Sequence, residues 1–107
     1  MRVNETSHFR RDFRRLAKKY PSLINEIRQI RADLLGNPQI GQPIGMSCYK
    51  IRVPIRSKGT GKRGGARIVT YVQLVEEDIY LLTIYDKSEQ SDISDKDILK
   101  IIESIDE

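Results

Sequence analysis

Residues 66–85 have the sequence ARIVTYVQLVEEDIYLLTIY, in which two runs rich in β-branched and aromatic residues flank a short polar stretch. Such runs favour strands, so the sequence predicts strands over 66–75 and 79–85, joined as a hairpin by residues 76–78. The second run is apolar on both faces, which is typical of an interior strand covered by helices on at least one face. We therefore expect a sheet with a helix layer.

A third predicted strand, over residues 48–56, precedes this hairpin and alternates in polarity. Its apolar face carries Tyr49, Ile51, Val53 and Ile55, and its other face carries Lys50, Arg52, Pro54 and Arg56. The alternation predicts a half-buried strand with a basic face, on which Lys50 and Arg52 project about 7 Å apart. Pro54 has no N–H to donate to a sheet, so it predicts an edge position or a bulge.

Two amphipathic helices are predicted ahead of this strand, over residues 9–20 and 23–35, because apolar side chains recur there at helical spacing. Thr6 or Ser7 is the expected cap of the first helix, and Ser22 is the expected cap of the second. A proline separates the two helices. Together they should form a helical hairpin.

The rest of the chain completes an α+β domain. Residues 37–47 contain turn-forming residues without periodicity and predict a loop, whereas Ser94 begins a capping-box pattern that predicts a short C-terminal helix. Residues 2–4 are a candidate opening strand. A run of helices followed by strands predicts an N-terminal helical hairpin packed on one face of a small antiparallel β-sheet, with the other face left for function.

Charge is divided sharply along the chain. Residues 1–75 carry 16 Lys and Arg against 4 Asp and Glu, whereas residues 76–107 carry 3 against 11. The charged side chains between positions 50 and 67 are all cationic: Lys50, Arg52, Arg56, Lys58, Lys62, Arg63 and Arg67. Clustered cations are typical of a surface that binds a polyanion, and a solvated basic loop is the alternative.

Composition argues against several kinds of site. Cys48 and His8 are the only residues of their types, so one chain cannot build an internal disulfide or a Cys/His zinc site, and we expect no metal and no cofactor. Cys48 is more typical of a small buried side chain, and His8 of a surface histidine, than of a catalytic group. The glycine-rich stretch 58–65 lacks the spacing and the following helix of a nucleotide-binding loop. No apolar run suits a membrane span or a secretory signal, so we expect a cytoplasmic protein without membrane contact.

Three motifs in order along the chain carry a resemblance to a known family. They are Cys48-Tyr49-Lys50-Ile51-Arg52, then the stretch from Lys58 to Tyr71, KGTGKRGGARIVTY, and the stretch from Tyr80 to Glu89, YLLTIYDKSE. With the helical hairpin in front, they resemble type II toxins of the RelE/ParE superfamily, particularly the RelE/HigB-like branch. The resemblance implies a single toxin domain with the RelE-like fold over residues 1–107, a cognate antitoxin, and an endoribonuclease that cleaves messenger RNA in the ribosomal A site.

The resemblance also implies catalytic roles for four cations. Lys50 and Arg52 match the basic pair on the toxin strand, and Arg67 matches the arginine that contacts the scissile phosphate. We therefore assign phosphate stabilisation to Arg67 and Arg52, and proton transfer to Lys50. Lys87 falls in the motif where these toxins keep a further cation. Cations suit metal-free cleavage, because attack by the 2′-hydroxyl creates a dianionic phosphorane. A lysine base needs a lowered pKa, which neighbouring cations are expected to provide.

Further residues are expected to bind RNA or depart from the family pattern. The expected RNA-binding residues are Arg56, Lys58, Lys62, Arg63, Tyr71 and Tyr85, of which the two tyrosines either stack on bases or belong to the sheet core. Ser88 and Ser94 stand where the family has an arginine and a tyrosine, and Ser94 is better explained as a helix cap. Asp86, beside Lys87, is expected either to take part in proton transfer or to pair with that lysine.

Two other functions stay open. One is a ParE-like gyrase poison that cleaves nothing, and the other is a catalytically inactive module that binds nucleic acid or an antitoxin. The long basic strand with its Lys-x-Arg pattern favours the ribonuclease, although cations suit binding and catalysis equally well. An acidic or amphipathic antitoxin segment laid across the cations would block RNA entry.

Overall fold

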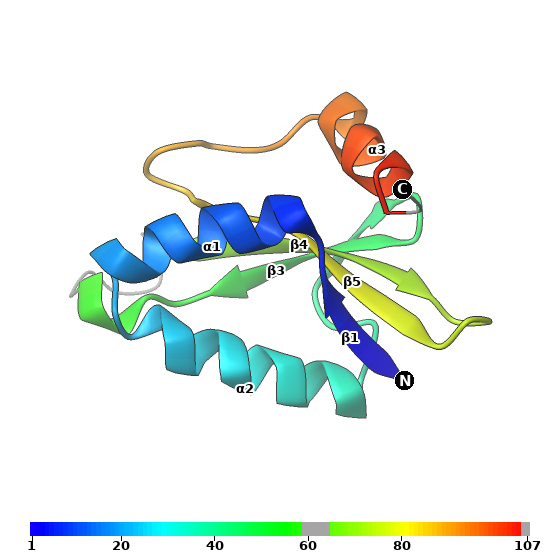
Figure 1. The fold of residues 1–107 in the computed structure, drawn as a ribbon, viewed down its shortest axis with the longest axis horizontal. Helices are drawn as coiled ribbons and strands as arrows, with labels where there is room; N and C mark the ends of the chain where they lie inside the picture. The colour runs from blue at the N-terminus through cyan, green and yellow to red at the C-terminus, as the bar shows by residue number, and fades with distance from the viewer. Residues whose placement is uncertain (59–64, 106–107) are drawn as a thin grey trace.

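The computed structural model describes residues 1–58 and 65–105, which form an α+β fold (Figure 1). In chain order its elements are β1 (Arg2–Glu5), α1 (Ser7–Lys19), α2 (Leu23–Gly36), β2 (Gln42–Gly45), β3 (Cys48–Val53), the single 3-10 turn η1 (Arg56–Lys58), β4 (Ala66–Gln73), β5 (Asp78–Asp86) and α3 (Asp95–Glu103). The predicted class, the helical hairpin and the C-terminal helix are confirmed. None of the helices in these ranges is long and apolar enough to cross a bilayer.

The five described strands form one sheet in the order β1-β5-β4-β3-β2. The predicted hairpin of β4 and β5 is confirmed, and β5 is interior, as its apolar sequence indicated. The sheet is mixed rather than wholly antiparallel, because β1 pairs in parallel with β5. The Arg2 guanidinium lies 3.1 Å from a carboxylate oxygen of Asp78, and Asn4 donates to the same oxygen, so polar side chains reinforce this pairing.

Two expectations about the opposite edge of the sheet are wrong. The segment 37–47 is not entirely a loop, because β2 lies within it and pairs with β3 across a bulge between Pro43 and Gly45. Such a short edge strand with a proline and a glycine carries no propensity signal. β3 is therefore not an edge strand, and it ends at Val53, so Pro54 follows the strand instead of creating a bulge within it.

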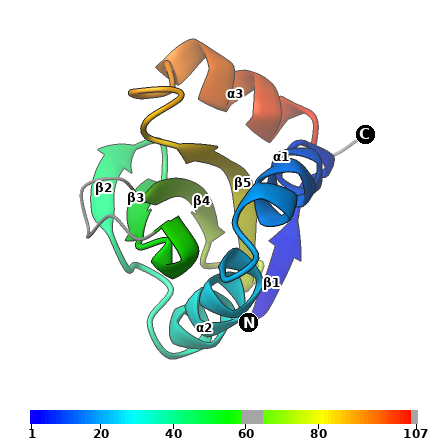
Figure 2. The same cartoon turned by 90° about the vertical axis from the view of Figure 1, so that its left-hand side faces the viewer.

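Hydrophobic side chains pack on both faces of the sheet. On one face α1 and α2 contribute Phe9, Leu16, Leu23, Ile27 and Leu34, which pack on Ile51, Ile68, Leu81 and Ile84. On the other face Ile98 and Ile101 of α3 pack on Cys48, Val69 and Leu82. Figure 2 shows α3 standing apart from the pair formed by α1 and α2. The expectation of a second face free of helices is therefore wrong where α3 lies.

Two of the three residues or residue pairs predicted to cap the helix N-termini are confirmed as side-chain caps. The Thr6 hydroxyl accepts from Phe9 N and caps α1, and the Ser94 hydroxyl accepts from Asp97 N and caps α3. Ser22 precedes α2 without capping it through its side chain. Its hydroxyl instead lies 2.7 Å from the Ser57 hydroxyl and donates to Glu26, because the turn after β3 packs against this end of α2.

Candidate nucleic-acid interface

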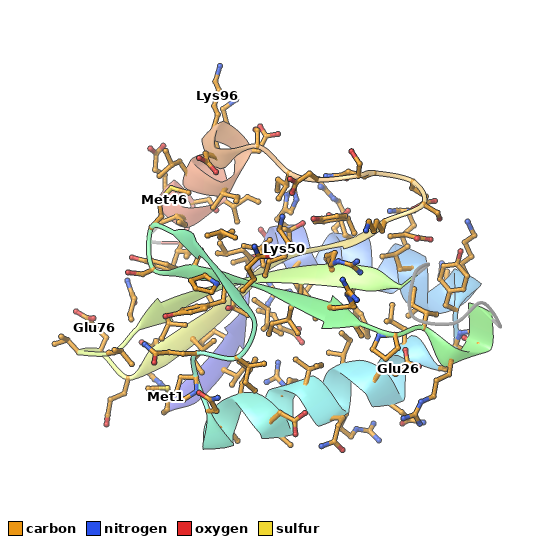
Figure 3. All side chains as sticks on the ribbon, turned by 180° about the vertical axis from the view of Figure 1, so that it is seen from behind. Met1, Glu26, Met46, Lys50, Glu76 and Lys96 are labelled. Atoms are coloured by element: carbon orange, nitrogen blue, oxygen red, sulfur yellow. The ribbon has the colours of Figure 1, made fainter. Side chains whose placement is uncertain are left out.

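A row of polar side chains crosses the sheet on the face opposite α1 and α2. Arg52 of β3 is paired in register with Arg67 of β4, and Arg67 is paired with Tyr85 of β5. Lys50 lies two residues from Arg52, so strand alternation places it on the same face. Figure 3 views the molecule from behind, with Lys50 labelled near its middle, α3 above the sheet and α2 below it. Residues far apart in sequence thus meet here.

Arg67 is buried although it is charged. Only 7% of its surface is exposed, and its guanidinium donates to the carbonyl oxygen of Ala66 at 3.1 Å. Within residues 1–58 and 65–105 no carboxylate lies within ion-pair distance of it. A buried cation without a counterion is costly in the free protein and is well suited to binding an anion.

Lys50 is an ion-paired cation rather than an activated base. Its Nζ lies 2.7 Å from Oδ1 of Asp92, and this hydrogen bond raises the pKa of Lys50 above its usual value. The positive charge of Arg67 acts in the opposite direction but has a smaller effect. The expected lowering of the lysine pKa by neighbouring cations is therefore wrong, because an acid that sequence reasoning did not place near Lys50 outweighs them.

Asp92 is the residue of this face that the sequence did not reveal. Its pKa is lowered chiefly by the hydrogen bond from Lys50 and also by the backbone N–H of Ile93. Tyr85 OH donates to the same Oδ1 at 3.4 Å, and burial raises the pKa of Tyr85. Asp92 lies in a segment without periodicity between β5 and α3, so no sequence pattern indicated its position.

Most of the predicted RNA-binding residues, and Lys87 of the predicted catalytic set, are dispersed. Tyr71 is half-buried beside Tyr80 in the core under α3, with ring centroids 6.3 Å apart. Arg56 is exposed beside the first turn of α2, where its N–H donates to Glu26. Lys87 is exposed directly after β5. The side chain of Lys58 and all of Lys62 and Arg63 lie outside the described residues.

Three remaining candidates, Cys48, His8 and Asp86, are either not activated for catalysis or lie away from the cationic face, by which we mean the face of the sheet that carries Lys50, Arg52 and Arg67. Burial raises the pKa of the Cys48 thiol to about 11, so it is not a nucleophile at neutral pH. His8 pairs with Asp12 at 3.3 Å, on the wall of a cavity of about 740 Å³ between α1 and α3. Asp86 is fully buried and accepts from Tyr20 OH at 3.0 Å, so it joins the helical hairpin to the sheet.

Comparison with known proteins agrees with this architecture. A family model described as "RelE toxin of RelE / RelB toxin-antitoxin system" matches residues 1–105. A solved structure of a doubly substituted Escherichia coli toxin RelE in the free state superposes with a TM-score of 0.63. The superposition covers 96% of this chain and 95% of that chain at 15% sequence identity, so it demonstrates a shared fold.

Proposed function

Because the chain belongs to the RelE family of toxins from toxin–antitoxin systems, we propose that it is an endoribonuclease that cleaves messenger RNA on the ribosome without a metal. The single observation that supports this most strongly is the row formed by Arg52 and Arg67, with Lys50 beside it on the same face of the sheet. Three cations on rigid strands provide a fixed positive site for a phosphate whose charge increases during the reaction.

The proposed reaction is an internal transesterification. The 2′-hydroxyl of the RNA releases its proton to solvent as its oxygen attacks the adjacent phosphorus, the bond to the 5′-oxygen breaks, and that oxygen takes up a proton. The products carry a 2′,3′-cyclic phosphate and a 5′-hydroxyl. Arg67 and Arg52 stabilise the two negative charges of the phosphorane by charge-assisted hydrogen bonds. Lys50 is a cation in the free protein, and we assign it phosphate binding and transfer of a proton to the departing 5′-oxygen.

One observation favours a second candidate, a module that binds RNA without cleaving it. Lys50 and Tyr85 both have raised pKa values, so neither is poised as a base near neutral pH to remove the 2′ proton. A non-cleaving protein would need only the cations. Cleavage and binding therefore have to be measured separately.

Primer extension on a messenger RNA in a purified translation system tests the proposal. We expect discrete cuts that require ribosomes, and a rate at least about 100-fold lower for Arg67→Ala, which removes a stabiliser of the transition state. Arg28→Ala is the matched control, because Arg28 is exposed on α2 and its guanidinium contacts the Asn25 side chain. Intact message with the wild-type protein would contradict the proposal, and a gyrase supercoiling assay would then test the poison alternative.

We further propose that the antitoxin places acidic side chains over Arg52 and Arg67, which lack carboxylate partners among the described residues. Titration of the purified antitoxin should show affinity falling with added salt, and less steeply for Arg52→Ala than for Arg28→Ala. Equal salt dependence of the two variants would contradict this mode of binding.

A further inference from the structure

The segment 87–94, which joins β5 to α3, is fastened by ion pairs to two separate parts of the molecule. Glu89 lies 3.2 Å from Arg15 and 3.6 Å from Lys19, both on α1. Asp92 forms the 2.7 Å ion pair with Lys50 on β3. Figures 1 and 2 show this segment leaving the end of β5 and running to α3 on the side of the sheet where α3 lies. Glu89 therefore fastens the segment to α1, and Asp92 fastens it to Lys50 on the opposite face of the sheet.

The Asp92 carboxylate is oriented before any ligand arrives. Its Oδ1 accepts from Ile93 N at 2.8 Å and from Tyr85 OH at 3.4 Å, in addition to Lys50 Nζ. The backbone carbonyl of Asp92 accepts from the Gln90 side-chain amide at 2.9 Å. One anionic oxygen is thus placed between a lysine ammonium and a tyrosine hydroxyl, which is an arrangement that also suits an oxygen of a phosphate group.

We propose that Asp92 occupies, in the free protein, the place on Lys50 that a phosphate of the RNA takes, so that segment 87–94 is an internal competitor of RNA. This inference rests on the proposed function in one respect, namely that the competing anion belongs to RNA. The competitor is a weak one, because 63% of the Asp92 side chain is exposed and exposed ion pairs contribute little. RNA can therefore displace it, at a small cost in affinity.

Fluorescence anisotropy with a short single-stranded RNA carrying 2′-O-methyl groups tests the inference, because this probe binds but cannot be cleaved. Asp92→Asn should bind about 1.5- to 5-fold more tightly than the control Asp95→Asn, which follows from the usual strength of an exposed ion pair. Asp95 is exposed at the start of α3, and its substitution changes the net charge equally. The dependence of log Kd on log salt should also steepen by up to about 0.7 for Asp92→Asn, because Lys50 is then free to contact a phosphate without releasing a carboxylate.

A second probe, inorganic phosphate, separates this inference from the proposed function. NMR signals of the Lys50 ammonium and the Tyr85 ring should shift at lower phosphate concentrations in Asp92→Asn than in Asp95→Asn. If no variant binds the RNA but phosphate behaves in this way, the proposed function fails and the competition by Asp92 stands. Equal phosphate binding by the two variants would overturn the inference, and weaker binding by Asp92→Asn would overturn it by showing that Asp92 positions Lys50 for the anion.

Discussion

Replacing Arg67 by methionine should make the protein more stable and inactive at the same time. Arg67 is 7% exposed, and the partner found for its guanidinium is the carbonyl oxygen of Ala66. It also lies directly opposite Arg52, and like charges at opposed strand positions are destabilising. Methionine keeps an unbranched side chain that can fill the same space without the charge.

The size of the effect follows from these contacts. Burial of an ion costs several kcal/mol even after relaxation, whereas one hydrogen bond from a charged group returns about 1.5–3 kcal/mol. The difference predicts that Arg67→Met raises the free energy of unfolding by about 1 kcal/mol or more. For a domain of this size that corresponds to a Tm higher by at least about 4 °C.

Urea unfolding followed by circular dichroism measures this gain, and primer extension on the same samples measures activity. Arg28→Met is the control, since an exposed substitution on α2 should change stability by less than about 0.5 kcal/mol. A clear loss of stability in Arg67→Met would refute the reasoning, because the polar contacts of Arg67 would then outweigh the cost of its burial. Unchanged activity would refute the assigned role in phosphate binding.

Three further predictions concern stability and reactivity. Thr6→Ala removes the side-chain acceptor of Phe9 N and should cost about 1–2 kcal/mol in urea unfolding. Tyr20→Phe removes a donor to the buried Asp86 carboxylate and should cost about 1–3 kcal/mol in the same assay, whereas a cost near zero would mean that other donors satisfy this carboxylate. The raised pKa of Cys48, about 11 against a usual 9.0, predicts alkylation by iodoacetamide at pH 8 about 100-fold slower in the native protein than in urea, and equal rates would show that the thiol is accessible and ionised.

The parts of the fold that the sequence predicted are those determined by local patterns. Alternation and β-branched residues located β4 and β5, and helical periodicity located α1 and α2. The candidate strand at residues 2–4 is confirmed as β1. Pairing with distant strands is not encoded locally, which is why the parallel pairing of β1 with β5 and the short strand β2 were not predicted. The position of β3 inside the sheet was missed for the same reason, since Pro54 indicated only that hydrogen bonding stops nearby.

The candidate site also contains residues that local patterns predicted and one residue, Asp92, that they did not. Alternation correctly placed Lys50 and Arg52 on one face, and the register of β3 with β4 brought Arg67 opposite Arg52. The position of Asp92 depends on how an aperiodic segment crosses the molecule, and that path is fixed by contacts such as the pair between Glu89 and Arg15. Asp92 is one of many acidic residues in the C-terminal third of the chain, and no sequence pattern distinguishes it as the partner of Lys50.

Charge segregation along the sequence has a different meaning once the chain is folded. The acidic C-terminal third supplies carboxylates to cations of the N-terminal part, as Asp78 does for Arg2 and Asp92 for Lys50. Among the described residues, most cations without such partners lie on exposed helix faces, where water solvates them at little cost. Arg67 is neither exposed nor paired within the described residues. Burial of Arg67 without a counterion among the described residues, rather than the number of cations between positions 50 and 67, therefore supports a phosphate site at β4. An anion bound there would neutralise a buried charge for which those residues supply no carboxylate.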